Sequence, residues 1–238
     1  MPLTPESSYT EIFQHLSEVQ TTSVCDAHPE VRLMNRTIDP LVKGSRCAGL
    51  AYTIHSAQDS LSTMQALDDL QDFLVSHGLA GEPSVPVLLV IASCDAPYAL
   101  VGDMCAKTAK VKGFEGVITD GYYRDIKETT ASGLPVFGTG KHAKSGPKDK
   151  VGTRREPIFC ADVTVNPYDI VLADDDGVVV MSREEAIPAI NKAMEIQRVE
   201  KIAEERIKDG ARFNEICNID EHVERLQQGL PSKLEMTL

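Results

Sequence analysis

Two short, uninterrupted apolar runs place the strongest constraint on the fold of this chain. They are VPVLLVIAS at residues 85–93 and GVITD at residues 116–120. Apolar runs of this length, in which polar and apolar residues do not alternate, predict buried strands. Residues 100–112, which lie between them, predict a helix that ends at Gly113. A buried strand, a helix and a second buried strand together indicate an α/β fold.

Further helices and strands are expected on either side of this unit. Helices are expected over residues 7–20 and 60–78, and a strand over residues 48–56. Ser182 to Glu185 form a capping box for a long, highly charged helix at 183–209, which we expect to pack on a neighbouring subunit. No repeat, linker or low-complexity segment interrupts the sequence, so a single domain is predicted over residues 1–238. Short strands are expected at 134–140, 157–165, 169–174 and 177–181, the last two forming a hairpin around Asp174-Asp175-Asp176-Gly177.

Composition and charge exclude several classes of partner. The formal net charge is −12, and such a surface repels nucleic acid and anionic membranes. No apolar run approaches the roughly 20 residues that a membrane-spanning helix needs. The start of the chain has neither the basic residues nor the apolar stretch of a secretory signal. The six cysteines are scattered without paired spacing, as in a reducing compartment, and we therefore expect a cytoplasmic protein.

One basic stretch, at residues 141–155, stands out against this acidic background. It holds six cationic side chains and several turn-forming residues, and no aromatic residue lies between the charges. Charged, glycine- and proline-rich runs usually form solvated and mobile loops, which is the interpretation we prefer for this stretch. The cationic residues are Lys141, Lys144, Lys148, Lys150, Arg154 and Arg155.

The candidate site combines two carboxylates and a guanidinium from two chain positions. Asp103 follows Gly102 at the start of a predicted helix, and Arg124-Asp125 comes twenty residues later, after the second apolar run. Two carboxylates can hold a hard divalent cation with its waters, and an arginine can bind an oxyanion beside it. The simpler alternatives are that Asp103 caps its helix and that Arg124-Asp125 is an ordinary surface pair. From these residues alone, both interpretations remain open.

Other common functional motifs are absent from the sequence. The six histidines lack the spacing of a zinc site, and the acidic hairpin turn lacks the alternating ligands of a calcium loop. The sequence also contains no nucleophile elbow, phosphate-binding loop or dinucleotide fingerprint. Serine hydrolases, nucleotide triphosphatases and dinucleotide-dependent enzymes are therefore not favoured.

The order of these motifs resembles the 4-hydroxy-4-methyl-2-oxoglutarate aldolase family, which also includes the regulators of ribonuclease activity A. The Asp103-x20-Arg124-Asp125 spacing is the signature of its enzymes, and the similarity covers about residues 20–210, leaving a tail at 211–238. The bulky Tyr122-Tyr123 pair departs from the usual small residues, so we expect it to influence the substrate. Tyr168 also stands where the family usually has glycine. The similar segments are 22–27, 49–53, 101–103, 116–121, 124–125, 135–137, 165–169 and 173–179.

The resemblance implies an α/β sandwich of the swivelling β/β/α kind and a metal-dependent class II pyruvate aldolase that also decarboxylates oxaloacetate. Mg²⁺ or Mn²⁺ is expected near Asp125, because oxygen-only ligation favours a hard cation. By the same resemblance, Asp103 orients a metal-bound water and Arg124 stabilises a pyruvate enolate. The keto acid carboxylate is expected at the N–H groups of Met104 and Cys105, beside Gly102.

The resemblance also implies trimers or pairs of trimers, with the sites at subunit interfaces. A glutamate of the long helix, for which we select Glu200, is expected to enter the site of a neighbouring subunit. The alternative is a non-catalytic regulator that binds a ribonuclease or an RNA helicase. Because such regulators often lack the Asp-x20-Arg-Asp signature, its presence favours the enzyme.

Overall fold

The computed structural model describes residues 1–79 and 85–237, and its centre is a mixed sheet of nine strands. Four parallel strands form the middle of this sheet: β3 (Cys47–His55), β4 (Val87–Ala92), β6 (Gly116–Thr119) and β8 (Val136–Gly138). The remaining strands are antiparallel to their neighbours: the hairpin β13 (Ile170–Asp174) and β14 (Gly177–Met181), and the short strands β1 (Arg32–Leu33), β2 (Asp39–Pro40) and β10 (Thr153–Arg154).

Two smaller sheets flank the main one. The first is a hairpin of β11 (Ile158–Cys160) and β12 (Val163–Val165). The second is entirely parallel and consists of β5 (Ala99–Val101), β7 (Tyr122–Tyr123) and β9 (Gly140–Lys141), with β7 in the centre. This small parallel sheet positions the candidate site.

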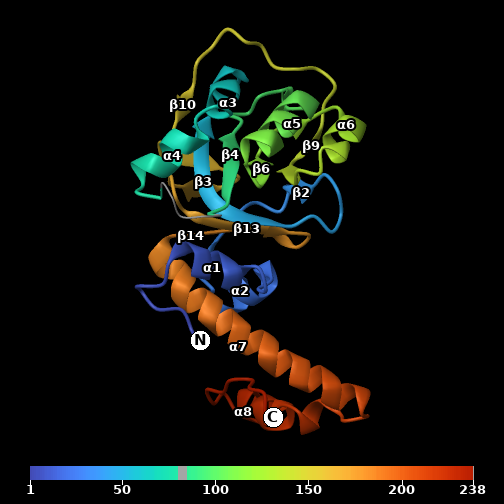
Figure 1. Ribbon diagram of the computed structural model, residues 1–238. Coiled ribbons are helices and arrows are strands. Elements are labelled where there is room, and N and C mark those ends of the chain that lie inside the picture. Colours follow the sequence, from blue (N-terminus) through green and yellow to red (C-terminus); the bar gives the residue numbers. More distant parts are fainter. Residues whose placement is uncertain (80–84, 238) are drawn as a thin grey trace.

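Two groups of helices lie on opposite sides of the molecule (Figure 1), and both pack against the same face of the curled main sheet. One group is α3 (Leu61–Ala66), α4 (Leu70–Ser76), α5 (Asp103–Lys112) and α6 (Ile126–Ala131). In the other group, α1 (Tyr9–Leu16), α2 (Thr21–Ala27) and the start of α7 (Arg183–Lys208) pack beneath β13 and β14. The β11–β12 hairpin packs against the other face of the sheet. The predicted α/β class and the long C-terminal helix are therefore confirmed. The predicted division into a core and a tail stays a prediction.

The apolar runs fold as their composition predicts. All six residues of β4 are buried, as are all four of β6, because helices cover one face and further strands or the opposite layer cover the other. Tyr52 of β3, Phe73 of α4 and Phe114 are fully buried aromatic residues of the same core. Each large apolar side chain buried in this way contributes roughly 1.5–3 kcal/mol relative to exposure.

Several predicted boundaries need correction. The helix expected at 60–78 is broken into α3 and α4 by a turn at 67–69, and the helix expected at 100–112 begins only at Asp103. The strand expected at 157–165 is a hairpin, because Ala161 and Asp162 adopt left-handed conformations with φ of 48° and 67°. The tail beyond 211 contains a 3₁₀ turn (Phe213–Glu215) and α8 (Ile219–Gln227).

Helix α7 begins with the predicted capping box, in which Ser182 and Glu185 bond each other's backbone N–H groups. Its first turns are buried against α2 and β14, whereas its second half projects away from the sheet, and α8 lies at its far end (Figure 1). Ile202 and Ile207 on this projecting half are exposed. Exposed isoleucines on a projecting helix are consistent with the predicted packing on a neighbouring subunit. None of the helices in the described residues combines the length and apolar character that a membrane crossing requires.

Candidate functional site at the ends of a small parallel sheet

The three strands of the small sheet run parallel, so their carboxyl ends lie along one edge. Gly102 and Asp103 follow β5, and Arg124 and Asp125 follow β7, which brings the two predicted segments together. A hydrogen bond of 3.0 Å from the Arg124 N–H to the Val101 carbonyl oxygen closes the contact. The sequence placed residues 100 and 101 in a helix, so this sheet was not predicted.

Gly102 is packed directly against the Arg124-Asp125 pair. A Cβ at position 102 would lie 2.8 Å from Asp125 Oδ2, closer than real Cβ atoms approach other groups, and 3.1 Å from Arg124 Cγ. Gly102 is also the N-cap residue of α5, and Asp103 is its first helical residue. The alternative in which Asp103 is the N-cap of this helix is therefore wrong.

Asp125 occupies an unusual backbone position. It precedes α6 as its N-cap with φ of 55°, in the left-handed region, and its side chain makes no capping hydrogen bond. Its carboxylate instead lies 3.3 Å from Nε of Arg124. Left-handed conformations at residues other than glycine are uncommon and concentrate at functional sites.

A cavity of about 480 Å³ joins these residues. All six residues predicted for the site within one chain line it: Gly102, Asp103, Met104, Cys105, Arg124 and Asp125. Glu200 does not line this cavity, which is compatible with its predicted role in a neighbouring subunit. Tyr122 and Tyr123 do not line it either: Tyr123 is buried against Gly138, and the Tyr122 ring packs near His142. The expected influence of the tyrosine pair on the substrate therefore has no direct contact with the cavity behind it and stays a prediction.

The start of α5 provides backbone donors at the cavity wall. The first intrahelical bond runs from the Ala106 N–H to the Gly102 carbonyl over 3.0 Å. The amides of Asp103, Met104 and Cys105 precede this bond and have no acceptor within the helix. Together with the helix dipole, they can bind a carboxylate.

The charge of Asp103 is stabilised by its neighbours. A 2.8 Å hydrogen bond from Lys107 is the main cause that lowers the pKa of Asp103, with contributions from the Met104 N–H and from Asp125. The same pairing raises the pKa of Lys107. By contrast, desolvation raises the pKa of the half-buried Cys105 thiol to about 12, so this thiol stays protonated and is a poor nucleophile.

The cavity supplies two carboxylates for a hard divalent cation, and water would have to complete its coordination. Asp103 and Asp125 supply carboxylate oxygens at one point, and they interact closely enough for Asp125 to affect the pKa of Asp103. Over residues 1–79 and 85–237, no group of three or more histidine, cysteine, aspartate or glutamate side chains is arranged to hold a metal. Mg²⁺ commonly binds through one or two carboxylates and retains several waters, so two carboxylates fit it better than they fit zinc.

The sequence did not predict the opposite wall of the cavity. Five of its residues come from α3, its N-cap residue and the following turn: Ser60, Thr63, Met64, Leu67 and Asp68. Ser145 and Lys148 come from the segment between β9 and β10, residues 142–152, which we call the strap. No local sequence signal marks these residues, since only the tertiary fold brings them to the site.

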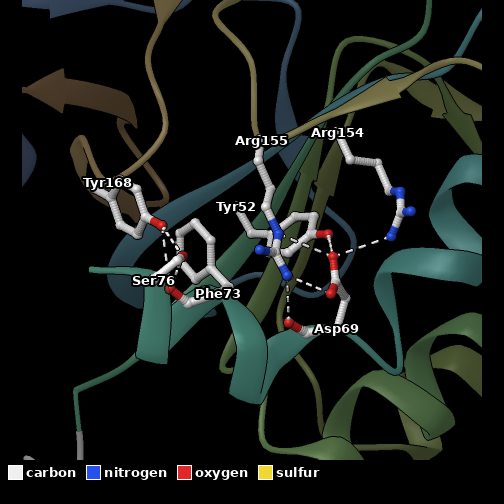
Figure 2. A network of polar contacts seen from close by, with 7 residues as sticks. All are labelled: Tyr52, Asp69, Phe73, Ser76, Arg154, Arg155 and Tyr168. Carbon is white, nitrogen blue, oxygen red and sulfur yellow. Dashed lines mark hydrogen bonds and ion pairs between the residues drawn. The ribbon is translucent and has the colours of Figure 1, made fainter. Parts of the chain in front are cut away.

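The strap belongs to the basic stretch that we expected to be a solvated loop, yet its backbone is fastened to the protein: Asp59 accepts the N–H groups of Asp149 and Lys150 over 2.8 and 2.9 Å. Residues just beyond it, Arg154 and Arg155, form ion pairs with Asp69, which also accepts a hydrogen bond from Tyr52 (Figure 2). In the same view, Tyr168 packs near Phe73 and bonds Ser76. The loop is thus basic and largely exposed, as predicted, but it is tied down.

An α/β sheet with a cavity at the carboxyl ends of parallel strands is the arrangement in which many α/β proteins bind small molecules. A sequence profile of the RraA-like family, described as Aldolase/RraA, matches residues 21–180, and the chain therefore belongs to this family.

Named relatives and solved structures agree with this membership. A protein of Halalkalibacterium halodurans, provisionally named 4-hydroxy-4-methyl-2-oxoglutarate aldolase, is 29% identical over 192 residues, covering 80% of this chain and 86% of the relative. The fold is similar to that of an uncharacterised Pseudomonas syringae protein, with a TM-score of 0.71, 20% identity, and coverage of 90% and 98% of the two chains. It is also similar to the RNA-processing inhibitor RraA of Thermus thermophilis, with a TM-score of 0.58, 22% identity, and coverage of 68% and 92%.

Proposed function

We propose that this protein is a divalent-metal-dependent lyase. It cleaves a 4-hydroxy-2-keto acid by a retro-aldol reaction to pyruvate and a second keto acid or an aldehyde, and it also decarboxylates oxaloacetate. The meeting of Asp103, Arg124 and Asp125 at one cavity carries this proposal. The provisional names of relatives such as the H. halodurans protein support the aldolase class.

The residues of the cavity suit the binding of a 2-keto acid. The amides of Met104 and Cys105, which have no acceptor within the helix, bind the substrate carboxylate at the start of α5. The Arg124 guanidinium then donates to the 2-oxo oxygen. Because this oxygen gains negative charge as the bond between C3 and C4 breaks, the interaction strengthens along the reaction and lowers the barrier.

The proton steps use Asp103. Retro-aldol cleavage removes a proton from the 4-hydroxyl group, breaks the C3–C4 bond and leaves its electron pair on the pyruvate fragment, whose C3 is then protonated. Asp103 stays ionised in the presence of Lys107 and can hold an ordered water that carries these protons. Asp125, with Asp103 beside it, would hold Mg²⁺ or Mn²⁺, which when bound supplies Lewis-acid polarisation of the keto acid.

The proposal includes an assembly and a location. We propose a homotrimer, or a hexamer of two trimers, in which the projecting half of α7 places Glu200 near the cavity of a neighbouring subunit. Glu200 is exposed and lies outside the cavity of its own chain. We also propose that the protein acts in the cytoplasm on small anionic keto acids, and not on nucleic acid or membranes.

Pyruvate release from oxaloacetate, with and without Mg²⁺, tests this function in the wild type and in Arg124→Ala and Asp125→Ala. We expect metal-dependent activity in the wild type and a loss of about 100-fold or more in each variant. Asp176→Ala, which changes an exposed carboxylate of the β13–β14 turn, is the matched control and should retain full activity. A wild type without metal-dependent activity on any 4-hydroxy-2-keto acid or oxaloacetate would refute the lyase. Full activity in both variants would refute the site assignment.

A second candidate function is the regulation of RNA processing. The structural similarity to the RNA-processing inhibitor RraA and the net charge of −12 favour it, because an acidic surface can bind a basic protein partner. Capture of a ribonuclease or RNA helicase at physiological salt, in a protein that turns over no keto acid, would favour this function over the lyase.

A further inference from the structure

A cysteine and a histidine meet at the carboxyl edge of the main sheet. His55 is the last residue of β3, Cys94 follows the end of β4, and these two strands are parallel neighbours. Cys94 Sγ lies 3.3 Å from His55 Nε2, so the thiol can donate a hydrogen bond to the imidazole. Neither residue lines the cavity that holds Asp103, Arg124 and Asp125. The pair is therefore a nucleophile and a base that the proposed lyase reaction does not use.

The turn that carries Cys94 is held in an unusual conformation. Cys94 and Asp95 both adopt left-handed backbone conformations, each with φ of 57°, which are uncommon for residues other than glycine. The Cys94 carbonyl accepts a hydrogen bond from Gln58 Nε2 over 2.8 Å, and the preceding Ser93 carbonyl accepts one from the Ser56 hydroxyl over 3.0 Å. The segment that follows β3 thus fixes the backbone on which the thiol stands.

The backbone of His55 is held as closely. Its partner across the sheet is Thr153 of β10. Gly152 packs directly on it, because a Cβ at position 152 would lie 1.8 Å from the His55 carbonyl oxygen. His55 is nevertheless exposed and Cys94 is half-buried, so a small solute can reach the sulfur.

Cys94 differs from the other cysteines that are not buried, which are Cys25 and Cys105. Desolvation raises the pKa of Cys25, with further contributions from Asp26 and Asp174, and it raises the pKa of Cys105 to about 12. These two thiols keep their protons at neutral pH, and a protonated thiol is a poor nucleophile. Cys94, by contrast, combines access to solvent with a base beside its sulfur.

We propose that Cys94 is a reactive thiol that hydroperoxides oxidise to a sulfenic acid, with His55 as the base that accepts the thiol proton. In the tautomer that carries its proton on Nδ1, His55 Nε2 takes the proton from Sγ and leaves a thiolate beside an imidazolium. With hydrogen peroxide, the sulfur attacks one oxygen, and the S–O bond forms as the O–O bond breaks. The sulfur gives two electrons to the peroxide, and the leaving hydroxide takes the proton from His55 and departs as water.

The oxidation is expected to be reversible through external thiols. Cys160 lies near enough for Cys94 to affect its pKa, but Cys160 is fully buried, and this burial raises its pKa well above the ordinary value. A thiol of this kind is a poor attacker of a sulfenic acid. An external thiol therefore attacks instead, forms a mixed disulfide with Cys94 and releases water, and a second external thiol then displaces Cys94 as a thiol.

The position of Cys94 connects its oxidation to the cavity. The turn continues through Tyr98 into β5, which ends directly before Gly102. The Tyr98 hydroxyl donates to the carbonyl of Gln58 over 2.6 Å, and the side chain of Gln58 bonds the Cys94 carbonyl. An oxygen added to Sγ needs space in this turn, so we expect β5 to shift and turnover to fall. This consequence rests on the proposed lyase function, whereas the oxidation itself does not.

Labelling of the full chain tests the oxidation. The protein is treated with hydrogen peroxide and then with dimedone, which traps sulfenic acids, and mass spectrometry identifies the labelled cysteines. We expect Cys94 to be labelled at peroxide concentrations that leave Cys25 unlabelled. In His55→Gln, the rate of labelling at Cys94 should fall about tenfold or more. His222→Gln, which removes an imidazole from α8, is the matched control and should keep the rate of the wild type.

Cys25 reports within each protein whether a variant has loosened the fold, since its labelling would then rise. Equal labelling of Cys94 and Cys25 in the wild type would refute the reactive thiol. A wild-type rate at Cys94 in His55→Gln would refute the role of His55.

Turnover of oxaloacetate measures the consequence for the cavity, after gel filtration has removed the peroxide. Oxidation should lower the wild-type rate about tenfold or more, dithiothreitol should restore it, and Cys94→Ser should keep its rate through the same treatment. Full activity in a wild type labelled at Cys94 would refute the effect on the cavity. A wild type without turnover of any keto acid would refute the lyase, and the labelling would still decide whether Cys94 is reactive.

Discussion

Gly102 packs so closely against Asp125 that any side chain at position 102 requires the Asp125 carboxylate to shift. The Cβ of any other residue at position 102 would lie 2.8 Å from Asp125 Oδ2. The contact joins the carboxyl ends of β5 and β7 and holds the Arg124-Asp125 pair at the start of α5. In the Asp103-x20-Arg124-Asp125 signature, the residue before the first aspartate is therefore as constrained as the charged residues.

We predict that Gly102→Ala impairs activity far more than stability. Its φ of −151° suits alanine, so the added methyl group acts by displacing Asp125 and Arg124. A displacement of about 1 Å at a reacting group can lower the rate about 100-fold. Keto acid turnover and thermal unfolding of the same preparation measure the two effects.

Gly44→Ala is the control for this prediction. Gly44 has φ of 81°, and the space around its missing Cβ is open, so alanine there introduces backbone strain of about 1 kcal/mol without touching the site. It should lower stability and leave kcat unchanged. If Gly102→Ala behaves like Gly44→Ala, the contact has no functional importance.

We predict that Lys107 controls the acid side of the pH–rate profile through Asp103. Its hydrogen bond is the main cause of the lowered pKa of Asp103, so Lys107→Met should bring that pKa back toward the ordinary value. Because the proposed mechanism needs the ionised carboxylate, activity should then begin to fall at a higher pH than in the wild type.

The pH dependence of kcat/KM measures this shift. Lys110→Met, in the next part of the same helix, removes a cation that pairs with Glu115 and lies outside the cavity. Lys110→Met should therefore leave the pH dependence of kcat/KM unchanged. An acid limb that stays at the same pH in Lys107→Met would show that Asp103 is not the group that must be ionised.

The parts of the fold that the sequence predicted well depend on local pattern. The uninterrupted apolar sequences of β4 and β6 leave no side chain suited to a solvent-exposed position, so both strands are buried. The capping box at Ser182 and Glu185 fixes the start of α7 through local hydrogen bonds alone. Asp103 and Arg124-Asp125 were grouped into one candidate site because of their side-chain types and their spacing. The structure places them together at the ends of β5 and β7.

What the sequence did not reveal depends on distant partners. Residues 99–101 are too few to show a strand pattern, and they pair with β7 only because the chain returns there. The attachment of the strap through Asp59 is equally invisible, since the bonded residues are about 90 positions apart. Tyr168 adopts φ of 69°, which glycine adopts freely, and its ring stacks on Phe73 and His77, which offsets the strain.

We predict that Tyr52 contributes to loss of stability at alkaline pH. Desolvation raises the pKa of Tyr52 from 10.0 to about 12, and its hydroxyl donates to Asp69. Between these two values the unfolded chain releases the proton while the folded chain retains it, so stability is complete below pH 10 and falls as the pH rises toward 12. Tyr52→Phe should flatten this fall.

Urea unfolding at several alkaline pH values gives the free energy of unfolding as a function of pH, and its slope is compared between the wild type and Tyr52→Phe. The buried Cys47 thiol, whose pKa burial also raises to about 12, adds a fall of its own that is common to both proteins. The difference between them therefore isolates Tyr52. Tyr122→Phe, which changes a half-buried tyrosine without a bond to Asp69, should keep the slope of the wild type. Identical slopes in all three proteins would contradict the role of Tyr52.

We predict that Glu200 acts in the site of a neighbouring subunit, which a mixed oligomer can demonstrate. Asp125→Ala and Glu200→Gln should each be almost inactive alone. In a trimer whose sites combine Asp125 of one chain with Glu200 of the next, random mixing of the two variants makes about a quarter of the sites intact. Coexpression of the two variants should therefore restore roughly a quarter of the wild-type activity, whereas mixing the purified proteins without exchange should restore none. If Glu200 acted within its own chain, every site would carry one defect, and coexpression would restore no activity.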